Sequence, residues 1–231
     1  MRRLGNPARA KQSLRFFKTG PGEYGEGDQF LGLTAPMLHA LARDHQDLPL
    51  VEVKRLLKST WHEERVLALL ILVRQYASGT AEERDRICRV YLAHTKYINN
   101  WDLVDCSAEH IVGAHLANGD RSKLTSLARS KDLWQRRIAV IATFHYIKRG
   151  AVRETFKIAR LLLDDEHDLI HKAVGWMLRE VGKRDRAALE AFLTRYALRM
   201  PRTMLRYAIE RFSPGERQKW LARQPQRFTE H

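Results

Sequence analysis

The stretch HKAVGWMLREV, His171 to Val181, has a clear helical pattern. Val174 is followed by apolar residues three, four and seven positions later, which is the spacing of one face of an α-helix. The same periodicity occurs in RVLALLILVRQYA, HIVGAHLA, RRIAVIATFHYIKR and TFKIARLLL. Strand-like alternation bounded by hairpin turns is absent from the sequence. The sequence therefore predicts an all-α protein.

The helical runs are separated by breakers at 78–80, 118–120, 149–150, 200–201 and 213–215. When the helices that follow alternate breaks are aligned, one column holds Arg65, Asp105, Arg137, Lys172 and Arg206. The spacings of 40, 32, 35 and 34 residues are typical of a repeat of two helices. We therefore expect one HEAT-like repeat domain over residues 1–231, a solenoid of about six helix pairs with a concave basic face. Residues 18–32 are expected to form an irregular, Gly-rich N-terminal loop.

The charge balance indicates a polyanionic partner. The chain has 41 Lys and Arg residues against 27 Asp and Glu, a formal net charge of +14. Such an excess usually serves nucleic-acid binding. No apolar run reaches the roughly 18 residues of a membrane span, and the N-terminus lacks the apolar segment of a signal peptide. Two cysteines are too few for a disulfide framework, so we expect a cytoplasmic protein, monomeric by default.

The aligned column predicts a row of cations along one face of the solenoid. Equivalent positions of stacked repeats fall in a row, and cations spaced along a groove suit a phosphate backbone. The DNA contacts expected from this column are Arg65, Arg137, Lys172 and Arg206. Asp105 is the exception, because a carboxylate facing DNA is repelled by it. Such a carboxylate suits chemistry that develops positive charge or needs a positioned water.

Two tryptophans accompany this column. Trp101 lies one helical turn before Asp105, and Trp176 lies one turn after Lys172. An aromatic face beside a carboxylate is a site for an organic cation. In the alternative interpretation, Asp105 pairs with Arg137 and only braces the repeats, and the tryptophans pack in the core. The sequence WHEER, Trp61 to Arg65, resembles a preceding repeat, with Glu63 and Glu64 on a solvated face.

The segments NNWDLVD, LWQRRIAVI and HKAVGWMLRE, in this order and spacing, resemble the AlkD-like DNA glycosylases. FLGLTAP near the N-terminus is also similar to that family, and the resemblance covers nearly the whole chain. It implies an all-α HEAT-like solenoid that removes N3- and N7-alkylated purines, such as 3-methyladenine and 7-methylguanine, from double-stranded DNA. It also implies that no metal and no cofactor is used and that the damaged base need not be flipped into a pocket.

The resemblance assigns roles by position. Asp105 resembles the family's catalytic aspartate, and Trp101, Arg137 and Trp176 resemble the other catalytic-site residues. The sequence departs from the family at two positions. Asn100 stands where a second aromatic residue is frequent, and Phe16 in RFFK stands where the family has a tyrosine. Tyr24 in the Gly-rich loop is a candidate replacement at the DNA, although the sequence is equally compatible with no replacement.

Other motifs in the sequence indicate no metal site, and two other functions stay open. His167 and His171 are four residues apart, but no HExxH pattern or third ligand accompanies them, so no metal site is predicted. A non-catalytic HEAT-like module that binds DNA or RNA remains open, since positive charge serves it equally well. Such a module has no use for Asp105. A protein-interaction scaffold is a third possibility, which the net charge argues against.

Overall fold

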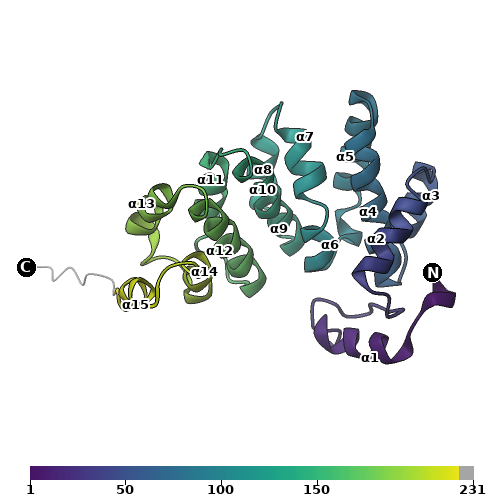
Figure 1. The fold of residues 1–231 in the computed structure, drawn as a ribbon, viewed down its shortest axis with the longest axis horizontal. Coiled ribbons are helices and arrows are strands. Elements are labelled where there is room, and N and C mark those ends of the chain that lie inside the picture. Colours follow the sequence, from purple (N-terminus) through teal and green to yellow (C-terminus); the bar gives the residue numbers. More distant parts are fainter. Residues whose placement is uncertain (224–231) are drawn as a thin grey trace, which may run out of the picture. The chain divides into compact units, whose positions relative to one another are not determined.

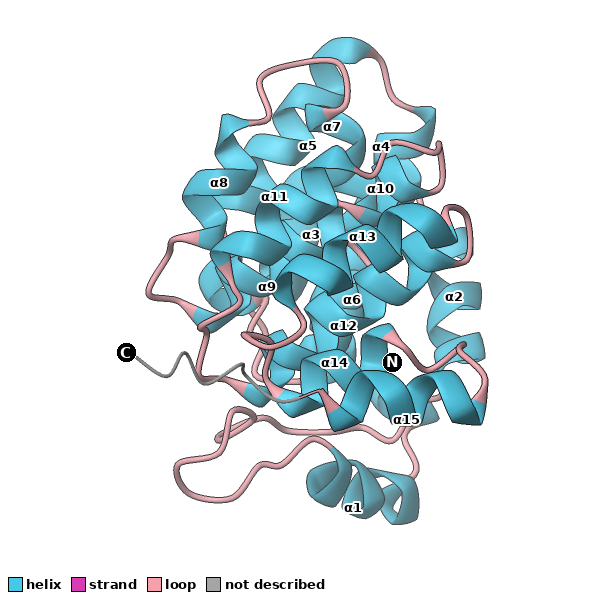
Figure 2. Ribbon diagram, turned by 90° about the vertical axis from the view of Figure 1, so that its left-hand side faces the viewer, coloured by secondary structure: helices cyan, strands magenta, loops and turns pink. Residues whose placement is uncertain are grey.

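The computed structural model describes residues 1–223, in which the regular elements are helices and strands are absent (Figures 1 and 2). An isolated bridge joins Gln29 to Trp61. Helices close in sequence pack against one another in a repeat-like manner, which confirms the predicted all-α, HEAT-like helical-repeat class. Contacts between Cα atoms group the chain into two compact units, one covering Met1–Gly119 and one beginning at Asp120.

The first unit is built around one long buried helix, α4. Its elements are η1 (Arg2–Leu4), α1 (Pro7–Phe16), α2 (Ala35–Asp44), α3 (Leu50–Leu57), α4 (His62–Ser78), α5 (Ala81–Ala93), η2 (Thr95–Tyr97), α6 (Trp101–Asp105), the π-helix η3 (Glu109–Gly113) and α7 (Ala114–Leu116). Residues 67–72 of α4 are buried without interruption. Helices α2, α3 and α5 pack against α4, which explains why its sequence is apolar on several faces.

The second unit is organised around α12. Its helices are α8 (Ser122–Ala128), α9 (Leu133–Ala142), α10 (Phe144–Ile147), α11 (Arg153–Leu161), α12 (Asp168–Gly182), α13 (Arg186–Tyr196), α14 (Arg202–Ala208) and α15 (Pro214–Ala222). The apolar face predicted from HKAVGWMLREV is buried against α9, α13 and α14. Gly175 allows the closest approach, because a Cβ there would lie 2.5 Å from the Met204 carbonyl oxygen of α14.

The positions aligned in the sequence occupy equivalent places in the helices. Each of them is the fourth or fifth residue of its own helix, in α4, α6, α9, α12 and α14. The aligned residues therefore share a position near the fourth or fifth residue of their helices. Their environments differ, however, because Arg65 and Arg137 are buried whereas Arg206 is exposed.

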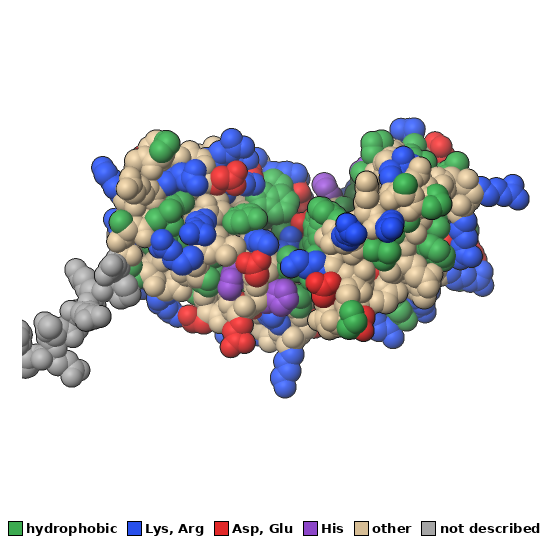
Figure 3. Space-filling model, turned by 90° about the horizontal axis from the view of Figure 1, so that it is seen from below, with side chains coloured by type: hydrophobic (Ala, Val, Ile, Leu, Met, Phe, Trp, Pro, Cys, Tyr) green, Lys and Arg blue, Asp and Glu red, His purple; other side chains and the backbone are tan. Residues whose placement is uncertain are grey.

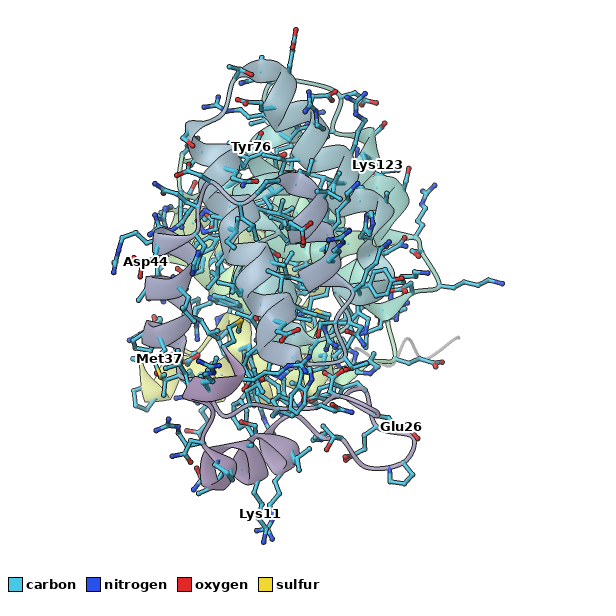
Figure 4. The ribbon with its side chains drawn as sticks, turned by 90° about the vertical axis from the view of Figure 1, so that its right-hand side faces the viewer. Lys11, Glu26, Met37, Asp44, Tyr76 and Lys123 are labelled. Atoms are coloured by element: carbon cyan, nitrogen blue, oxygen red, sulfur yellow. The ribbon has the colours of Figure 1, made fainter. Side chains whose placement is uncertain are left out.

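A loop without helix, residues 17–34, connects α1 to α2 and contains the Gly-rich stretch. Gly32 has a φ of +75°, and a Cβ there would meet the Asn6 carbonyl oxygen at the start of α1. The Glu63 carboxylate accepts hydrogen bonds from the backbone N–H groups of Leu31 and Gly32, at 2.9 and 2.7 Å. In Figure 4, Glu26 lies on this loop and Lys11 points outward from α1.

The interpretation of Glu63 and Glu64 as a solvated face is wrong. Glu63 is only 3% exposed, because its carboxylate satisfies backbone donors that would otherwise be buried without a partner. Glu64 is half-buried, accepts a hydrogen bond from the Ser59 hydroxyl at 2.6 Å and forms an ion pair with Arg2. Both acids therefore hold the N-terminal segment on α4.

Candidate active site

The candidate site of the first unit is organised by α6, which begins with Trp101 and ends with Asp105. The side chain of Asn100 caps the helix by accepting a hydrogen bond from the Trp101 N–H at 2.8 Å. At the other end, the Ser107 hydroxyl donates to the Leu103 carbonyl oxygen at 2.5 Å. Trp101 and Asp105 are half-buried, so both keep access to the surface.

Aromatic rings from the N-terminal segment surround Trp101. Phe16 meets it edge-on, with ring centroids 5.5 Å apart and planes at 72°. Phe17 stacks on Trp101 at 5.4 Å and on Phe30 at 5.1 Å. Phe16 is 63% exposed. Phe16 is therefore an accessible ring in contact with Trp101.

A buried chain of ionisable groups runs beneath these rings. His62, at the start of α4, is 2% exposed, and its two ring nitrogens face two carboxylates. Nε2 lies 2.7 Å from an oxygen of Asp102, and Nδ1 lies 3.2 Å from an oxygen of Asp28. Sequence reasoning missed His62. The signal was present, since His62 precedes Asp102 by 40 residues, the same spacing that separates Arg65 from Asp105 in the repeat.

The pKa values of His62 and Asp28 are shifted so that both side chains are charged at neutral pH. Burial disfavours the imidazolium of His62, but the hydrogen bonds to Asp102 and Asp28 outweigh it and raise its pKa to about 9. Burial likewise raises the pKa of Asp28, but His62 and Arg65 outweigh that effect and hold it below its usual value. His62 is therefore a cation at neutral pH, with its ring near those of Phe17 and Phe30.

Arg65 does not occupy the position expected of a phosphate contact. It is buried, and its guanidinium donates to Asp28 at 2.7 Å and to the Ser59 carbonyl oxygen at 3.0 Å. A buried carboxylate such as Asp28 requires a charged partner, and this requirement fixes Arg65 in the interior. The DNA-contact role expected for Arg65 therefore needs correction to an internal ion pair.

Two groups near Asp105, the Cys106 thiol and the Tyr91 phenol, have raised pKa values and stay protonated. Burial raises the pKa of the Cys106 thiol, and the carboxylates of Asp102 and Asp105 raise it further. Burial also raises the pKa of Tyr91, whose hydroxyl shares a hydrogen bond with Ser107 at 2.9 Å. The thiol and phenol next to Asp105 thus remain neutral, and neither competes with it as an anion. Tyr24 is half-buried in the Gly-rich loop.

The remaining predicted residues belong to the second unit. Arg137 is buried on α9 and donates to the Leu169 carbonyl oxygen at 2.6 Å. Trp176 is half-buried; its indole N–H donates to Glu180 at 3.2 Å, and its ring lies 6.0 Å from that of Phe144. Lys172 pairs with Asp168 at 2.6 Å. Burial raises the pKa of Asp168, but Lys172, together with Thr203 and His171, outweighs this effect and lowers it. Figure 3 shows Lys and Arg side chains on the visible surfaces of the protein, with Asp and Glu side chains interspersed.

Comparisons with known proteins agree with the fold. A family model described as DNA alkylation repair enzyme matches residues 1–212. A solved structure, described as a predicted DNA alkylation repair enzyme from Enterococcus faecalis, superposes with a TM-score of 0.70 at 18% identity, covering 91% of this chain and 97% of that one. At that identity the likeness concerns the fold alone. No curated protein matches the chain. No helix among residues 1–223 is long and apolar enough to span a bilayer.

Proposed function

The chain belongs to the DNA alkylation repair enzyme family, and we propose that it is a DNA-alkylpurine N-glycosylase. Its substrate is double-stranded DNA with a cationic purine alkylated at N3 or N7, such as 3-methyladenine or 7-methylguanine. The observation that carries this proposal is the presence on α6 of a half-buried aspartate, Asp105, and a half-buried tryptophan, Trp101, one helical turn apart. A phosphate-binding module needs neither.

The reaction requires little from a general acid. A purine alkylated at N3 or N7 carries a positive charge, and when the C1′–N9 bond breaks the electron pair leaves with the base and neutralises it. The sugar becomes oxocarbenium-like, water adds to C1′, and the water loses a proton. The Asp105 carboxylate stabilises the positive sugar and orients the water. One preorganised electrostatic contact of this kind contributes roughly 3–4 kcal/mol in other enzymes.

The aromatic rings bind the lesion because it is a cation. A cation over the face of a tryptophan gains about 0.5–2 kcal/mol, more when water is excluded. Trp101, with Phe16 at its edge, provides such a surface on α6. Trp176 on α12 is proposed as a second one. The selectivity that follows is for charged adducts, since a neutral purine gains little from these rings and leaves poorly.

The phosphate groups of the DNA are proposed to contact the exposed or partly exposed cationic side chains. Arg206 is exposed, and Lys172 is partly exposed. Arg137 is buried on α9, so its predicted phosphate contact needs correction in the same way as that of Arg65, and it is proposed only to act near the lesion. Tyr24 is proposed to contact the DNA from its loop. Arg65 is omitted because its guanidinium is used inside the protein. These contacts position the backbone and read no sequence.

The decisive experiment compares wild type with Asp105→Asn on duplex DNA containing one 7-methylguanine, at equal DNA occupancy. We expect base release by wild type and a loss of about 10²–10³-fold in the variant, with DNA affinity equal or higher because a repelling charge is removed. Asp47→Asn, an exposed aspartate between α2 and α3, is the matched control. Tight binding with no release by any of the three proteins would sink the proposal. Equal release from a neutral purine would contradict the mechanism.

A further inference from the structure

The helix that carries the proposed site is too short to fix its own orientation. Within and around α6, the N–H groups of Val104 and Cys106 donate to the carbonyl oxygens of Asn100 and Asp102. A single turn of helix is unstable alone, because nucleation costs more than its few hydrogen bonds return. The orientation of Trp101 and Asp105 therefore depends on the side chains that tie α6 to the rest of the first unit.

Asp102 supplies the tie on the side of α4. One of its oxygens accepts from the Leu103 N–H at 2.9 Å, and the other lies 2.7 Å from His62 Nε2. The second ring nitrogen of His62 faces Asp28, which Arg65 holds at 2.7 Å. A neutral imidazole has one N–H, so it would leave one of the two carboxylates facing a lone pair. Only the doubly protonated ring satisfies both.

We propose that His62, as an imidazolium held between Asp28 and Asp102, is the positioning residue that fixes α6, and with it Trp101 and Asp105, for cleavage of the glycosidic bond. The inference rests on the proposed function for its catalytic readout. His62 acts through Asp102 and through the ring of Phe17, which packs on both His62 and Trp101.

The charged state of this residue gives the proposal a pH signature. The groups that face His62 are Asp102 from α6, Asp28 from the loop before α2, and Arg65 from its own helix, where only Arg65 opposes the charge. The resulting pKa of about 9 predicts that base release by wild type falls as the pH rises through this value. Replacing Asp102 by asparagine removes one stabilising charge, so the alkaline limb moves to lower pH.

The test measures single-turnover base release from the 7-methylguanine duplex at saturating protein, from neutral pH to above the pKa of His62. The variants are His62→Gln, Asp102→Asn and the double variant, with His39→Gln, an exposed histidine on α2, as control. We expect each single variant to lose about 10²-fold in rate, the effect of a displacement near 1 Å. The double variant should lose no more than the larger single effect, because both changes break one contact.

Binding separates positioning from a loss of DNA contact. The Kd for the duplex should change little, because neither variant removes a phosphate-facing cation. His62→Gln that releases base at the rate of His39→Gln would overturn the proposal. An Asp102→Asn variant that keeps the wild-type alkaline limb would overturn it as well. If His62→Gln fails to fold, Asp102→Asn, whose side chain is partly exposed, still provides the pH test.

A further measurement distinguishes failure of the glycosylase proposal from failure of the proposed role of His62. If wild type releases no base at any pH, the glycosylase proposal and the catalytic part of this one both fall. Amide hydrogen exchange of α6 then decides whether His62 still fixes the helix. Faster exchange in His62→Gln than in His39→Gln supports the tie, and equal exchange overturns it.

Discussion

The ring of Phe16 meets the ring of Trp101 edge-on, with centroids 5.5 Å apart. Phe16 is the last residue of α1, and Trp101 is the first residue of α6. The contact joins an exposed ring of the N-terminal segment to the helix that carries Asp105. An aromatic pair of this geometry contributes about 0.5–1.5 kcal/mol beyond its buried area.

Phe16→Ala is therefore expected to slow release of 7-methylguanine by up to about 10-fold, the upper end of that range. The free energy of unfolding should fall by no more than this same contact energy, because the side chain is 63% exposed and buries little additional area. Leu14→Ala, on the same helix and also exposed, is the matched control and should keep the wild-type rate. Phe16→Tyr should retain activity because it keeps the ring. If alanine at position 16 behaved like alanine at position 14, the contact would have no part in the reaction.

Much of the fold is predictable from the sequence because periodicity and spacing report directly on packing. Val174 and Met177 are buried on α12 as their spacing indicates. The aligned residues fall at the fourth or fifth position of their helices, as the spacing indicates, although their burial differs. The contacts that a side chain makes with distant segments cannot be predicted from periodicity and spacing. Glu63 looks like a solvent-exposed acid in its own helix and is buried only because an N-terminal loop far away in sequence supplies backbone donors.

The site was predictable in part for the same reason. The aromatic and acidic residues of NNWDLVD stand on one helix, so their proximity follows from local geometry. The internal role of Arg65 is not visible in the sequence, because its partner Asp28 lies in a loop without periodicity. His62 was overlooked because a histidine beside two glutamates has no distinctive local pattern. Its significance depends on carboxylates contributed by two other segments.

The stability of the first unit should depend on pH through His62 and Asp28. The pKa of His62 is raised to about 9 in the folded protein, so its contribution is complete below the unfolded value of about 6.5 and is lost as the pH rises through 9. The pKa of Asp28 is lowered, so its contribution is present above its unfolded value and lost as the pH falls through the folded one.

Urea unfolding at several pH values tests this dependence. The difference in unfolding free energy between wild type and His62→Gln should be largest at mildly acidic pH, below about 6.5, and should shrink as the pH rises from there through about 9. His39→Gln serves as the control, since its side chain is exposed. A difference that stays constant from neutral to strongly alkaline pH would show that His62 is uncharged in the folded protein.

The two arginines at the ends of the aligned column should behave differently toward DNA. Arg206 is exposed on α14, and Arg206→Gln should weaken binding to undamaged duplex and reduce the slope of log K against log salt by about 0.9. Arg65→Gln should leave that slope unchanged and lower the thermal midpoint, because it leaves the Asp28 carboxylate without its charged partner. A fluorescence binding titration over a salt series measures the salt slope of both variants, and thermal unfolding measures the midpoint of Arg65→Gln. A reduced salt slope for Arg65→Gln would contradict its buried placement.

The contact between α12 and α14 makes Gly175 sensitive to substitution. A methyl group there would lie 2.5 Å from both the Met204 carbonyl oxygen and the Tyr207 Cβ, neither of which is the end of a flexible side chain. Overpacking of this kind costs about 1–3 kcal/mol, against a gain of at most about 1 kcal/mol in helix propensity. We therefore expect Gly175→Ala to lower the unfolding free energy. Gly215→Ala in α15 is the matched control, since open space surrounds that position and only the propensity gain applies. Chemical denaturation of both variants should move their midpoints in opposite directions, and a stabilised Gly175→Ala would mean that α12 and α14 are not in such close contact.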